Sequence, residues 1–563
     1  MTHVTKIKGC AGAGKSYTSR EEIVAELENG VAPVETCISS FTRAACEDIR
    51  EGVKDAVESQ DGLPSDFADG VSVETFNALC RRAAMVDGWG YKELIALDKK
   101  SDEEHFQAFF ASEMKHISFA TPNPEDFEMS TSGAKMINAF NQIRAAGYND
   151  IEDFAREAQS LDLGCKQHEF LVFVALWSSW KRETGNRQHS DYVDYVRKNE
   201  LIPERENGDK YRVLVIDEFQ DLSPLQYAVY TQWRDSGEFD RIIIAGDAAQ
   251  SVYGFRGADP RYFEKTPADK EIELSESRRC APDVIEYADE IIKGEDYFSS
   301  KLSSTRSNNE RVRVEKNHPL KSIDGLTRLV KWHGGEYSST FILARRNKDV
   351  GKIAKALNKA GVPHLSVSPA AAERYEGLWY WDEPLPHLRL LFRNWDNGLL
   401  VNAEWIDAYL DNTTIDNRYS RSDKSVSVLL DRDSTAPDSE GDVMYPPEVM
   451  DIVTGGLTVR EAIQSLDLDE GRVEALKNAL RAGLEIYPGQ IKIGTIHSAK
   501  GLEAESVILM GETTDKRFSK LQLGGEELAE EKRLYHVGVT RAMDSVFVAS
   551  GLFGSKRSPA LPR

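Results

Sequence analysis

Gly9-Cys10-Ala11-Gly12-Ala13-Gly14-Lys15-Ser16 is the stretch that decides the fold of this chain. It has the Gly-x4-Gly-Lys-Ser spacing of a phosphate-binding loop, with an apolar run at residues 4–8 before it and a helical pattern at residues 17–27 after it. Its glycines let backbone N–H groups point at phosphate oxygens, and the helix adds its positive N-terminal end. We therefore expect an α/β domain that binds a nucleotide triphosphate through residues 9–16, with Tyr17 beside them.

A second stretch supplies the carboxylates that such a loop needs. Val213-Leu214-Val215-Ile216-Asp217-Glu218-Phe219-Gln220-Asp221 is an apolar strand that ends in paired acids. Lys15 can reach the outer phosphates, and a Mg2+ ion held jointly by Ser16 and Asp217 gives the buried carboxylate a partner. Glu218 is then placed to orient or deprotonate the attacking water. The alternative interpretation is a solvated acidic turn after a core strand.

Short apolar, β-rich runs alternate with helical patterns along the chain, which predicts parallel sheets wrapped by helices. Two sets of strands are expected. They lie at residues 4–8, 36–40, 71–76, 213–217 and 242–247, and at residues 340–345, 491–495, 506–510 and 545–549. Aromatic helical stretches, such as residues 106–114 and 170–180, interrupt the first set. A polar acidic tract at residues 420–442, which we expect to be mobile, lies in the interruption of the second.

The length, net charge and cysteine pattern of the chain limit the kind of protein that it can be. A chain of 563 residues exceeds what one hydrophobic core usually supports, so several domains are expected. The net charge of -23 argues against a protein that coats nucleic acid with its whole surface, so a polyanion would be held in a local groove. Apolar runs stay far below the roughly 20 residues of a membrane helix, and the polar residues before Gly9 lack the pattern of a secretory leader, so we expect none. We expect a cytoplasmic or nucleoid-associated protein whose six cysteines, without a Cys-x-x-Cys pair, are reduced.

The box Asp217-Glu218-Phe219-Gln220-Asp221 resembles the DExxQ-type Walker B motif of the UvrD/Rep-like branch of superfamily 1 DNA helicases. Further motifs similar to those of the family follow in order. They lie at residues 40–45, 74–77, 246–258, 274–279, 494–503 and 531–542. The most specific are Gln250-Ser251-Val252-Tyr253-Gly254-Phe255-Arg256-Gly257-Ala258 and the stretch from Thr495 to Glu503. The resemblance spans nearly the whole chain.

The resemblance implies an α/β fold with two RecA-like P-loop NTPase cores, each carrying a mainly helical insertion. Residues 1–85 and 190–262 would form the first core, and residues 86–189 its insertion. Residues 263–374 and 490–563 would form the second core, which carries arginine fingers. Residues 375–489 would form a short second insertion.

It also implies roles around the nucleotide. Gln250 would couple the terminal phosphate to a nucleic-acid contact, while Arg279 and Arg541 would act as catalytic arginines at the γ-phosphate of ATP. Glu503 would lie near the ribose. Arg278 stands where the family commonly has a tyrosine that stacks on the base, and a guanidinium plane can stack on a purine as well. The family's upstream glutamine, which reads adenine, has no match among the eight residues before Gly9.

Candidate contacts to the nucleic acid come from the same motifs. Aromatic rings offer π-faces on which bases of any sequence can stack, although an aromatic residue is more often part of a core. The candidate stacking residues are Phe41, Tyr192, Tyr253 and Phe255, and Phe76 is a further candidate contact to the nucleic acid. The candidate contacts to the phosphodiester backbone are Thr42, Arg43, Thr75, Arg256 and His497.

The function implied is that of an ATP-dependent DNA helicase that moves 3′ to 5′ along single-stranded DNA and couples ATP hydrolysis to strand separation, as in DNA repair or replication. Such a motor would engage single strands and single-strand/duplex junctions, act as a monomer and need ATP with Mg2+. RNA is a less favoured track. The alternatives are a translocase that strips proteins from DNA without unwinding it, and a P-loop NTPase without motor action.

Overall fold

The computed structural model describes residues 2–41, 43–58, 70–90, 94–95, 103–119, 131–205, 207–295, 302–367, 381, 383–414, 436–437, 443–483, 486, 489–552 and 556–562. The chain divides into two compact units. The first unit contains Met1–Val314, Lys516–Asp544 and Ser558–Arg563, and the second contains Glu315–Asp515 and Ser545–Arg557. The predicted bounds of the four domains stay a prediction. Apart from residues 436–437, the acidic tract at residues 420–442 lies outside the described residues.

A six-stranded sheet organises the first unit. Its order is β3-β2-β4-β5-β1-β6, and every neighbouring pair is parallel. The strands are β1 (His3–Gly9), β2 (Thr36–Ser40), β3 (Ser72–Thr75), β4 (Val213–Ile216), β5 (Arg241–Gly246) and β6 (Lys270–Leu274). Parallel strands end at the same edge of a sheet, so the loop after β1 lies at the same edge as the residues after β4 and β5.

The apolar run of β4 is explained by burial on both faces of this sheet. Val213 and Val215 pack in a cluster with Ile23 of helix α1 (Lys15–Glu28). Leu214 and Ile216 pack in another cluster with side chains of α3 (Phe76–Val86), α8 (His189–Lys198) and α9 (Pro224–Asp235). Successive side chains of a strand point to opposite faces, so a strand covered on both sides is continuously apolar.

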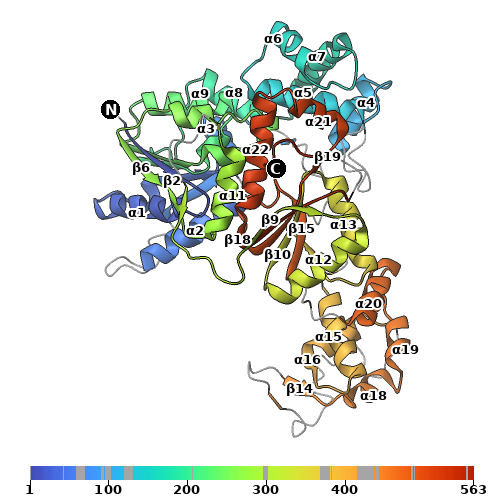
Figure 1. The fold of residues 1–563 in the computed structure, drawn as a ribbon. Helices are drawn as coiled ribbons and strands as arrows, with labels where there is room; N and C mark the ends of the chain where they lie inside the picture. The colour runs from blue at the N-terminus through green and yellow to red at the C-terminus, as the bar shows by residue number, and fades with distance from the viewer. Residues whose placement is uncertain are drawn as a thin grey trace. The chain divides into compact units, whose positions relative to one another are not determined.

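Further helices and two short strands complete this unit outside its insertion (Figure 1). They are α2 (Arg43–Glu58), α10 (Arg261–Lys265), α11 (Pro282–Ile292), α21 (Asp515–Leu521), α22 (Glu526–Val539), β7 (Glu276–Ser277) and β8 (Ser303–Ser304).

A helical insertion interrupts this unit, and its predicted helices at residues 106–114 and 170–180 are confirmed in α4 and α7. The insertion contains α4 (Glu103–Glu113), α5 (Ser132–Ala145), α6 (Ile151–Glu157) and α7 (Gln167–Thr184). Its core is aromatic: the Phe109 ring meets the Trp177 ring edge-on, with centroids 4.9 Å apart. Aromatic residues at helical spacing therefore build the core of the insertion.

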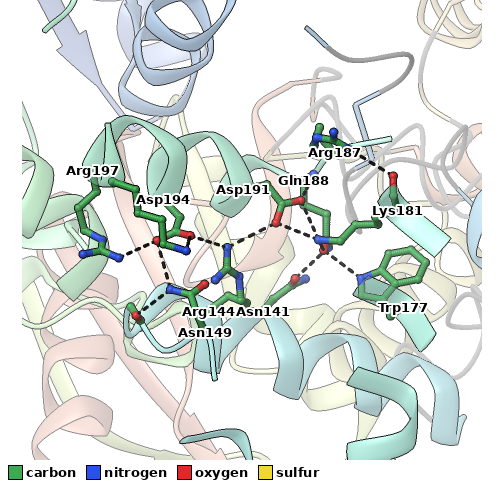
Figure 2. Close-up of polar contacts among 12 residues, drawn as sticks. Asn141, Arg144, Asn149, Trp177, Lys181, Arg187, Gln188, Asp191, Asp194 and Arg197 are labelled. Carbon is green, nitrogen blue, oxygen red and sulfur yellow. Dashed lines mark hydrogen bonds and ion pairs between the residues drawn. The ribbon is translucent and has the colours of Figure 1, made fainter. Parts of the chain in front are cut away.

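A buried network of charges ties the insertion to α8 (Figure 2). The Lys181 ammonium donates to both carboxylate oxygens of Asp191, at 2.9 and 2.7 Å. Arg144 of α5 lies between Asp191 and Asp194, with its Nη2 3.5 and 3.4 Å from their oxygens. The Gln188 side chain accepts from Lys181 at 3.0 Å. Three helices are thus joined by paired ions that are largely shielded from water.

The electrostatics of the network favour ionised carboxylates. Burial by itself would raise the pKa of Asp191, but the Lys181 and Arg144 cations lower it below its usual value. Burial opposes ionisation of Asp194 in the same way, and hydrogen bonding to Lys198 together with the Arg144 cation lowers its pKa. Both carboxylates therefore contribute stability that is present above the unfolded-state pKa, near 4, and is lost as pH falls below it.

The second unit has its own six-stranded sheet, in the order β11-β15-β10-β16-β18-β9. Strand β10 is parallel to both β15 and β16. The strands are β9 (Arg313–Pro319), β10 (Thr340–Ala344), β11 (Leu365–Ser366), β15 (Ile491–Thr495), β16 (Ala504–Met510) and β18 (Ala542–Ser550). All predicted strands of both sets are confirmed, and so is the α/β fold with parallel sheets flanked by helices.

Helices flank this second sheet, and a mainly helical insertion follows. The flanking helices are α12 (Ile323–Glu336) and α13 (Asn347–Lys359), and a short pair is formed by β17 (Glu512–Thr513) and β19 (Lys556–Arg557). The insertion contains α15 (Leu385–Asp396), α16 (Ala403–Asp411), α18 (Val449–Thr454), α19 (Val459–Gln464) and α20 (Glu470–Ala482), with β12 (Val401–Asn402), β13 (Ala436–Pro437) and β14 (Val443–Tyr445). Its helices share one apolar cluster around Phe392 and Tyr409.

Several strands of two or three residues were not predicted, and neither were the longer strands β6 and β9. Strand β6 has the sequence Lys-Glu-Ile-Glu-Leu and β9 contains three charged residues, and both form outer strands of their sheets. Edge strands face water on more sides and carry charge, which hides them from a search for apolar runs. The six cysteines are free, as predicted. None of the helices in the described ranges is long and apolar enough to cross a membrane.

Replacing Asp191 by Asn should destabilise the protein by about 3 to 5 kcal/mol, because it leaves the buried Lys181 cation without its carboxylate. Urea unfolding followed by tryptophan fluorescence measures this, since Trp177 lies in the same core. The matched control is Asp235→Asn, which removes an exposed carboxylate paired with Arg234 and should change the stability little.

The difference between wild type and Asp191→Asn should shrink as the pH falls below about 4, because the unfolded wild-type chain then binds a proton at Asp191 that the folded carboxylate, with its lowered pKa, does not yet bind. The double variant Lys181→Met/Asp191→Asn should recover most of the loss, because no buried cation remains unpaired. An Asp191→Asn protein as stable as the control variant would contradict the structural importance of this ion pair.

Candidate nucleotide site and its polar network

The loop at residues 9–16 connects β1 to α1 and has the shape of a phosphate cradle. Gly12 and Gly14 adopt left-handed backbone conformations, with φ of 69° and 92°. Gly14 is the N-cap of α1, so no capping side chain covers the first-turn amides of the helix. The Lys15 ammonium donates to the carbonyls of Gly9 and Cys10, at 2.9 and 3.2 Å. Exposed amides and a held cation are what an anionic phosphate chain requires.

The loop is packed against the segment that carries the predicted arginines. The Arg278 backbone N–H donates to the Gly12 carbonyl at 2.9 Å. A Cβ atom at Gly12 would lie 2.4 Å from Cβ of Arg279, so only glycine fits at this position. Both arginines therefore lie beside the loop, within the first unit.

The rim of the loop carries two planar groups. Tyr17, on the first turn of α1, is 54% exposed. A hydrogen bond to Glu21 raises the pKa of Tyr17, and the nearby Arg278 cation opposes that rise. The Arg278 side chain is also exposed. In contrast, Cys10 lies inside, and burial raises its thiol pKa to about 12, which makes it an unreactive neutral group.

The predicted carboxylates lie at the carboxyl end of β4. Asp217 is buried, and its backbone N–H donates to the Ser39 carbonyl of β2 at 2.9 Å. Glu218 follows in a left-handed conformation, with φ of 54°. This conformation costs a residue with a side chain about 1 to 2 kcal/mol. Strain of this kind at a polar strand end is typical of a functional site.

A chain of hydrogen bonds connects Glu218 to Arg541. The Gln220 amide donates to the Glu218 carboxylate, and its oxygen accepts from the Asp247 backbone at 3.0 Å. The Asp247 carboxylate accepts from the Gln250 amide at 2.6 Å. The Gln250 oxygen accepts from Nη2 of Arg541 at 3.0 Å. We call the set Glu218, Gln220, Asp247, Gln250 and Arg541 the polar relay.

The relay is held in place by its neighbours. The Ser251 hydroxyl donates to the Gln220 carbonyl at 3.1 Å, and Nε of Arg533 donates to the Ser251 carbonyl at 3.0 Å. A Cβ atom at Gly246 would lie 2.6 Å from the Gln220 side-chain oxygen, so glycine at this position leaves room for the amide. Arg541 itself is only 1% exposed. The polar relay is therefore largely buried, and its neighbours fix the positions of its side chains.

Arg533 and Arg541 come from the α22 segment, whose His536 is also buried. The His536 Nδ1 atom lies 3.1 Å from the Ala288 carbonyl of α11, and burial lowers its pKa. A neutral imidazole therefore joins α22 to α11. This contact fixes the helix whose end supplies Arg541.

Sequence reasoning missed four residues of this site. Gln220, Asp247 and Arg533 stand inside the quoted motifs, and their polar character next to apolar strands was a usable signal. Arg306 carried no signal, yet its guanidinium donates to the Arg279 carbonyl at 2.5 Å and to the Met543 carbonyl at 3.0 Å. It therefore fastens the arginine segment to the start of β18.

The residues predicted to contact nucleic acid differ in where the structure places them. Tyr253 and Arg256 lie together after the relay, with the guanidinium carbon 5.5 Å from the ring centroid. Phe41 is partly buried against the core. Thr42 lies outside the described residues, as do the side chains of Arg43 and Phe255.

Two of the predicted contacts are corrected by burial. Tyr192 is 0% exposed and meets the Trp89 ring edge-on, and Phe76 is 2% exposed with its ring 5.2 Å from Trp233. A ring enclosed in a core offers no face to a base, so the predicted contact of both rings with nucleic acid is wrong in this structure. The Thr75 hydroxyl accepts from the Ala78 backbone at 3.3 Å and caps α3, and its contact to the phosphodiester backbone stays a prediction.

His497 and Glu503 belong to the second unit. His497 is half-buried in the turn after β15, and Glu503 is exposed just before β16. Their predicted roles toward DNA and the ribose stay predictions.

The residues at this edge suit a Mg2+ ion bound together with phosphates. Ser16 lies in the first turn of α1 and Asp217 directly follows β4, and both supply oxygen, which this hard cation prefers. Mg2+ usually takes one or two protein oxygens beside phosphates and water, so a larger cluster is not required. Accordingly, no three His, Cys, Asp or Glu side chains gather around one point within the described part of the chain.

Alanine substitutions at Gly12 and Gly14 should separate packing from backbone strain. Gly14→Ala should cost about 1 to 2 kcal/mol, because φ is positive but no atom lies near the new methyl group. Gly12→Ala should cost about 1 to 3 kcal/mol more, since the methyl group also meets Arg279. Thermal unfolding without nucleotide measures both, and equal stabilities would contradict the contact with Arg279.

Comparison with known proteins agrees with this arrangement. The model of the UvrD/REP helicase N-terminal domain matches residues 1–271, and that of the UvrD-like helicase C-terminal domain matches residues 460–551. The ATP-dependent DNA helicase PcrA of Staphylococcus aureus is 22% identical over 630 residues, covering 97% of this chain and 82% of that protein. PcrA of Staphylococcus epidermidis is 21% identical over 633 residues, with the same coverage. On its motifs, its parallel sheets and these matches, the chain belongs to the UvrD/REP helicase family.

Proposed function

We propose that this chain is an ATP-dependent DNA helicase that moves along single-stranded DNA and couples ATP hydrolysis to strand separation. The observation that carries the proposal is the polar relay, which joins the candidate base Glu218 to Arg541 through Gln250. Gln250 stands three residues before Tyr253, a candidate DNA contact. A change at the nucleotide can therefore be passed to the polymer through one short segment.

The loop at residues 9–16 and the residues at its rim would bind the nucleotide. Lys15 and the first amides of α1 would hold the phosphates of ATP, and Ser16 with Asp217 would hold the Mg2+ ion, which neutralises phosphate charge. Tyr17 and Arg278 would flank the base as planar groups, without hydrogen bonds that select adenine.

Glu218, Arg279 and Arg541 would catalyse the hydrolysis of ATP. The Glu218 carboxylate would accept a proton from the attacking water, and its link to Gln220 fixes where that carboxylate lies. Arg279 and Arg541 would stabilise the charge that develops on the γ-phosphate, a contribution of about 10³ to 10⁵ in rate in related reactions. Burial of Arg541 strengthens this interaction by excluding water.

The segment from Gln250 to Arg256 would couple ATP hydrolysis to the contact with DNA. Gln250 shares its oxygen with Arg541 and its amide with Asp247, so a shift of Arg541 toward phosphate would break one of these bonds. The Ser251 carbonyl, held by Arg533, would transmit the shift to Tyr253 and Arg256. We propose that the two cores alternately grip and release one strand as ATP binds and is hydrolysed, with movement from 3′ to 5′.

The variant Glu218→Gln should still bind ATP but lose DNA-stimulated hydrolysis by about 10² to 10⁴, because the amide cannot accept the proton of the attacking water. Nucleotide binding is measured with a fluorescent ATP analogue, and turnover by phosphate release with oligothymidine. Glu113→Gln, the same change at an exposed glutamate of α4, is the control. Full turnover by Glu218→Gln would remove the basis of the site assignment.

Replacing Tyr253 by Ala should weaken binding of oligothymidine by about 1 to 3 kcal/mol, or roughly 5- to 150-fold, because a stacking surface is lost. The matched variant Tyr253→Phe keeps the ring under Arg256 and should bind like wild type. Fluorescence anisotropy measures both. If Tyr253→Ala and Tyr253→Phe bind equally well, Tyr253 is not a stacking residue.

A further inference from the structure

Helices α12 and α13 of the second unit enclose a groove of about 1010 Å³. Its walls contain residues of both helices, together with Ala360 and Leu552. None of its lining residues belongs to the nucleotide site or to the predicted DNA contacts. The lining residues are Ile323, Asp324, Thr327, Arg328, Lys331, Lys352, Lys355, Ala356, Lys359, Ala360 and Leu552.

The charge of the groove is opposite to that of the chain. Five of its lining residues are basic and one is acidic, a balance of +4, whereas the whole chain carries -23. A smaller hollow of about 420 Å³ shares Arg328 and adds His318 and Lys321 to the same surface. A strongly acidic protein thus presents a continuous basic surface on one pair of helices.

The cations project from well-anchored helices. On α13, Ile353, Ala354 and Leu357 are buried, while Lys352 and Lys355 are exposed on the groove side. On α12, Leu326 and Val330 are buried, and Arg328 is exposed. The basic side chains therefore project from a packed scaffold, and binding an anion would require ordering of side chains alone.

The spacing fits a repeating anion. Lys352, Lys355 and Lys359 are three and four residues apart on one face of α13, and together they span about 10 Å along the helix axis. Measured along the axis of a DNA duplex, where the phosphates of one strand follow at 3.4 Å, that length corresponds to about three phosphates.

We propose that this groove binds the phosphodiester backbone of the duplex that flanks the single-stranded track of the motor. Lysine and arginine contact phosphates without reading bases, as a motor on any sequence requires. The groove has few large apolar residues, Ile323 and Leu552, whereas a protein partner would need buried aromatic or aliphatic anchors. The proposal rests on the proposed helicase function, since it takes DNA as the polyanion.

The test uses the full-length protein with Lys352→Gln/Lys355→Gln/Lys359→Gln, and with Arg328→Gln/Lys331→Gln for the opposite wall. The control Lys54→Gln/Lys293→Gln/Lys516→Gln removes three exposed lysines of the first unit. Anisotropy over a salt series gives the slope of log Kd against log salt. The probes are oligothymidine, a tailed duplex, and a fork with two single-stranded tails.

Each lost phosphate contact should flatten the slope by about 0.9, so the three-lysine variant should lose about 2.7 relative to the control variant. The loss should appear on the tailed duplex and on the fork, which both contain a duplex. A loss on the fork alone would overturn the proposal, because the groove would then bind the displaced strand. ATPase activity at saturating oligothymidine should equal that of wild type.

Equal slopes for the three-lysine variant and the control on every probe would overturn the proposal. An equal loss of affinity for oligothymidine would also overturn it, because the groove would then belong to the motor track. Failure of the helicase function is recognised separately, as a wild-type protein whose ATPase activity does not respond to DNA. The slopes report on the groove in either case.

Discussion

The parallel alignment of β1, β4 and β5 is the constraint on which the site depends. It places the ends of three buried strands at one edge, and each end continues into a polar segment. Polar groups buried there must find partners, and they find one another: Asp217 bonds to the end of β2, and Asp247 bonds to Gln220 and Gln250. The geometry needed for phosphate chemistry therefore follows from satisfying hydrogen bonds at the end of the sheet.

Buried polar contacts also link the parts of the first unit. The ion network around Arg144 positions α5, and a Cβ atom at Gly257 would meet the methyl group of Ala145 at 3.2 Å, at the end of that helix. Gly257 follows directly on the segment with Tyr253 and Arg256. The helical insertion therefore supports the candidate DNA contacts on one side, while the polar relay supports them on the other. Both supports consist of packed or hydrogen-bonded contacts, which can pass a shift on to this segment only by rearranging.

Much of the fold and of the nucleotide site could be predicted because the residues that form them show local sequence patterns. The strands that were found are apolar on both faces, and the loop at residues 9–16 needs glycines that local sequence displays. The edge strand β6 was missed because its residues are mostly charged. Tyr192 and Phe76 were assigned to DNA because their motifs suggested it, whereas the aromatic core around Trp89 and Trp233 encloses them.

The sequence by itself determined the phosphate loop, the carboxylates after β4, the strand pattern and the family, since these depend on residue types at short spacing. Only the tertiary structure decided which polar groups meet. The bond from Arg541 to Gln250 joins residues 291 positions apart, and Arg306 reaches Met543 across 237 positions. The basic groove likewise depends on the packing of two helices, because each of its lysines, taken alone in the sequence, looks like an ordinary solvent-exposed charge. Such contacts depend on how distant segments pack, and no local pattern records that.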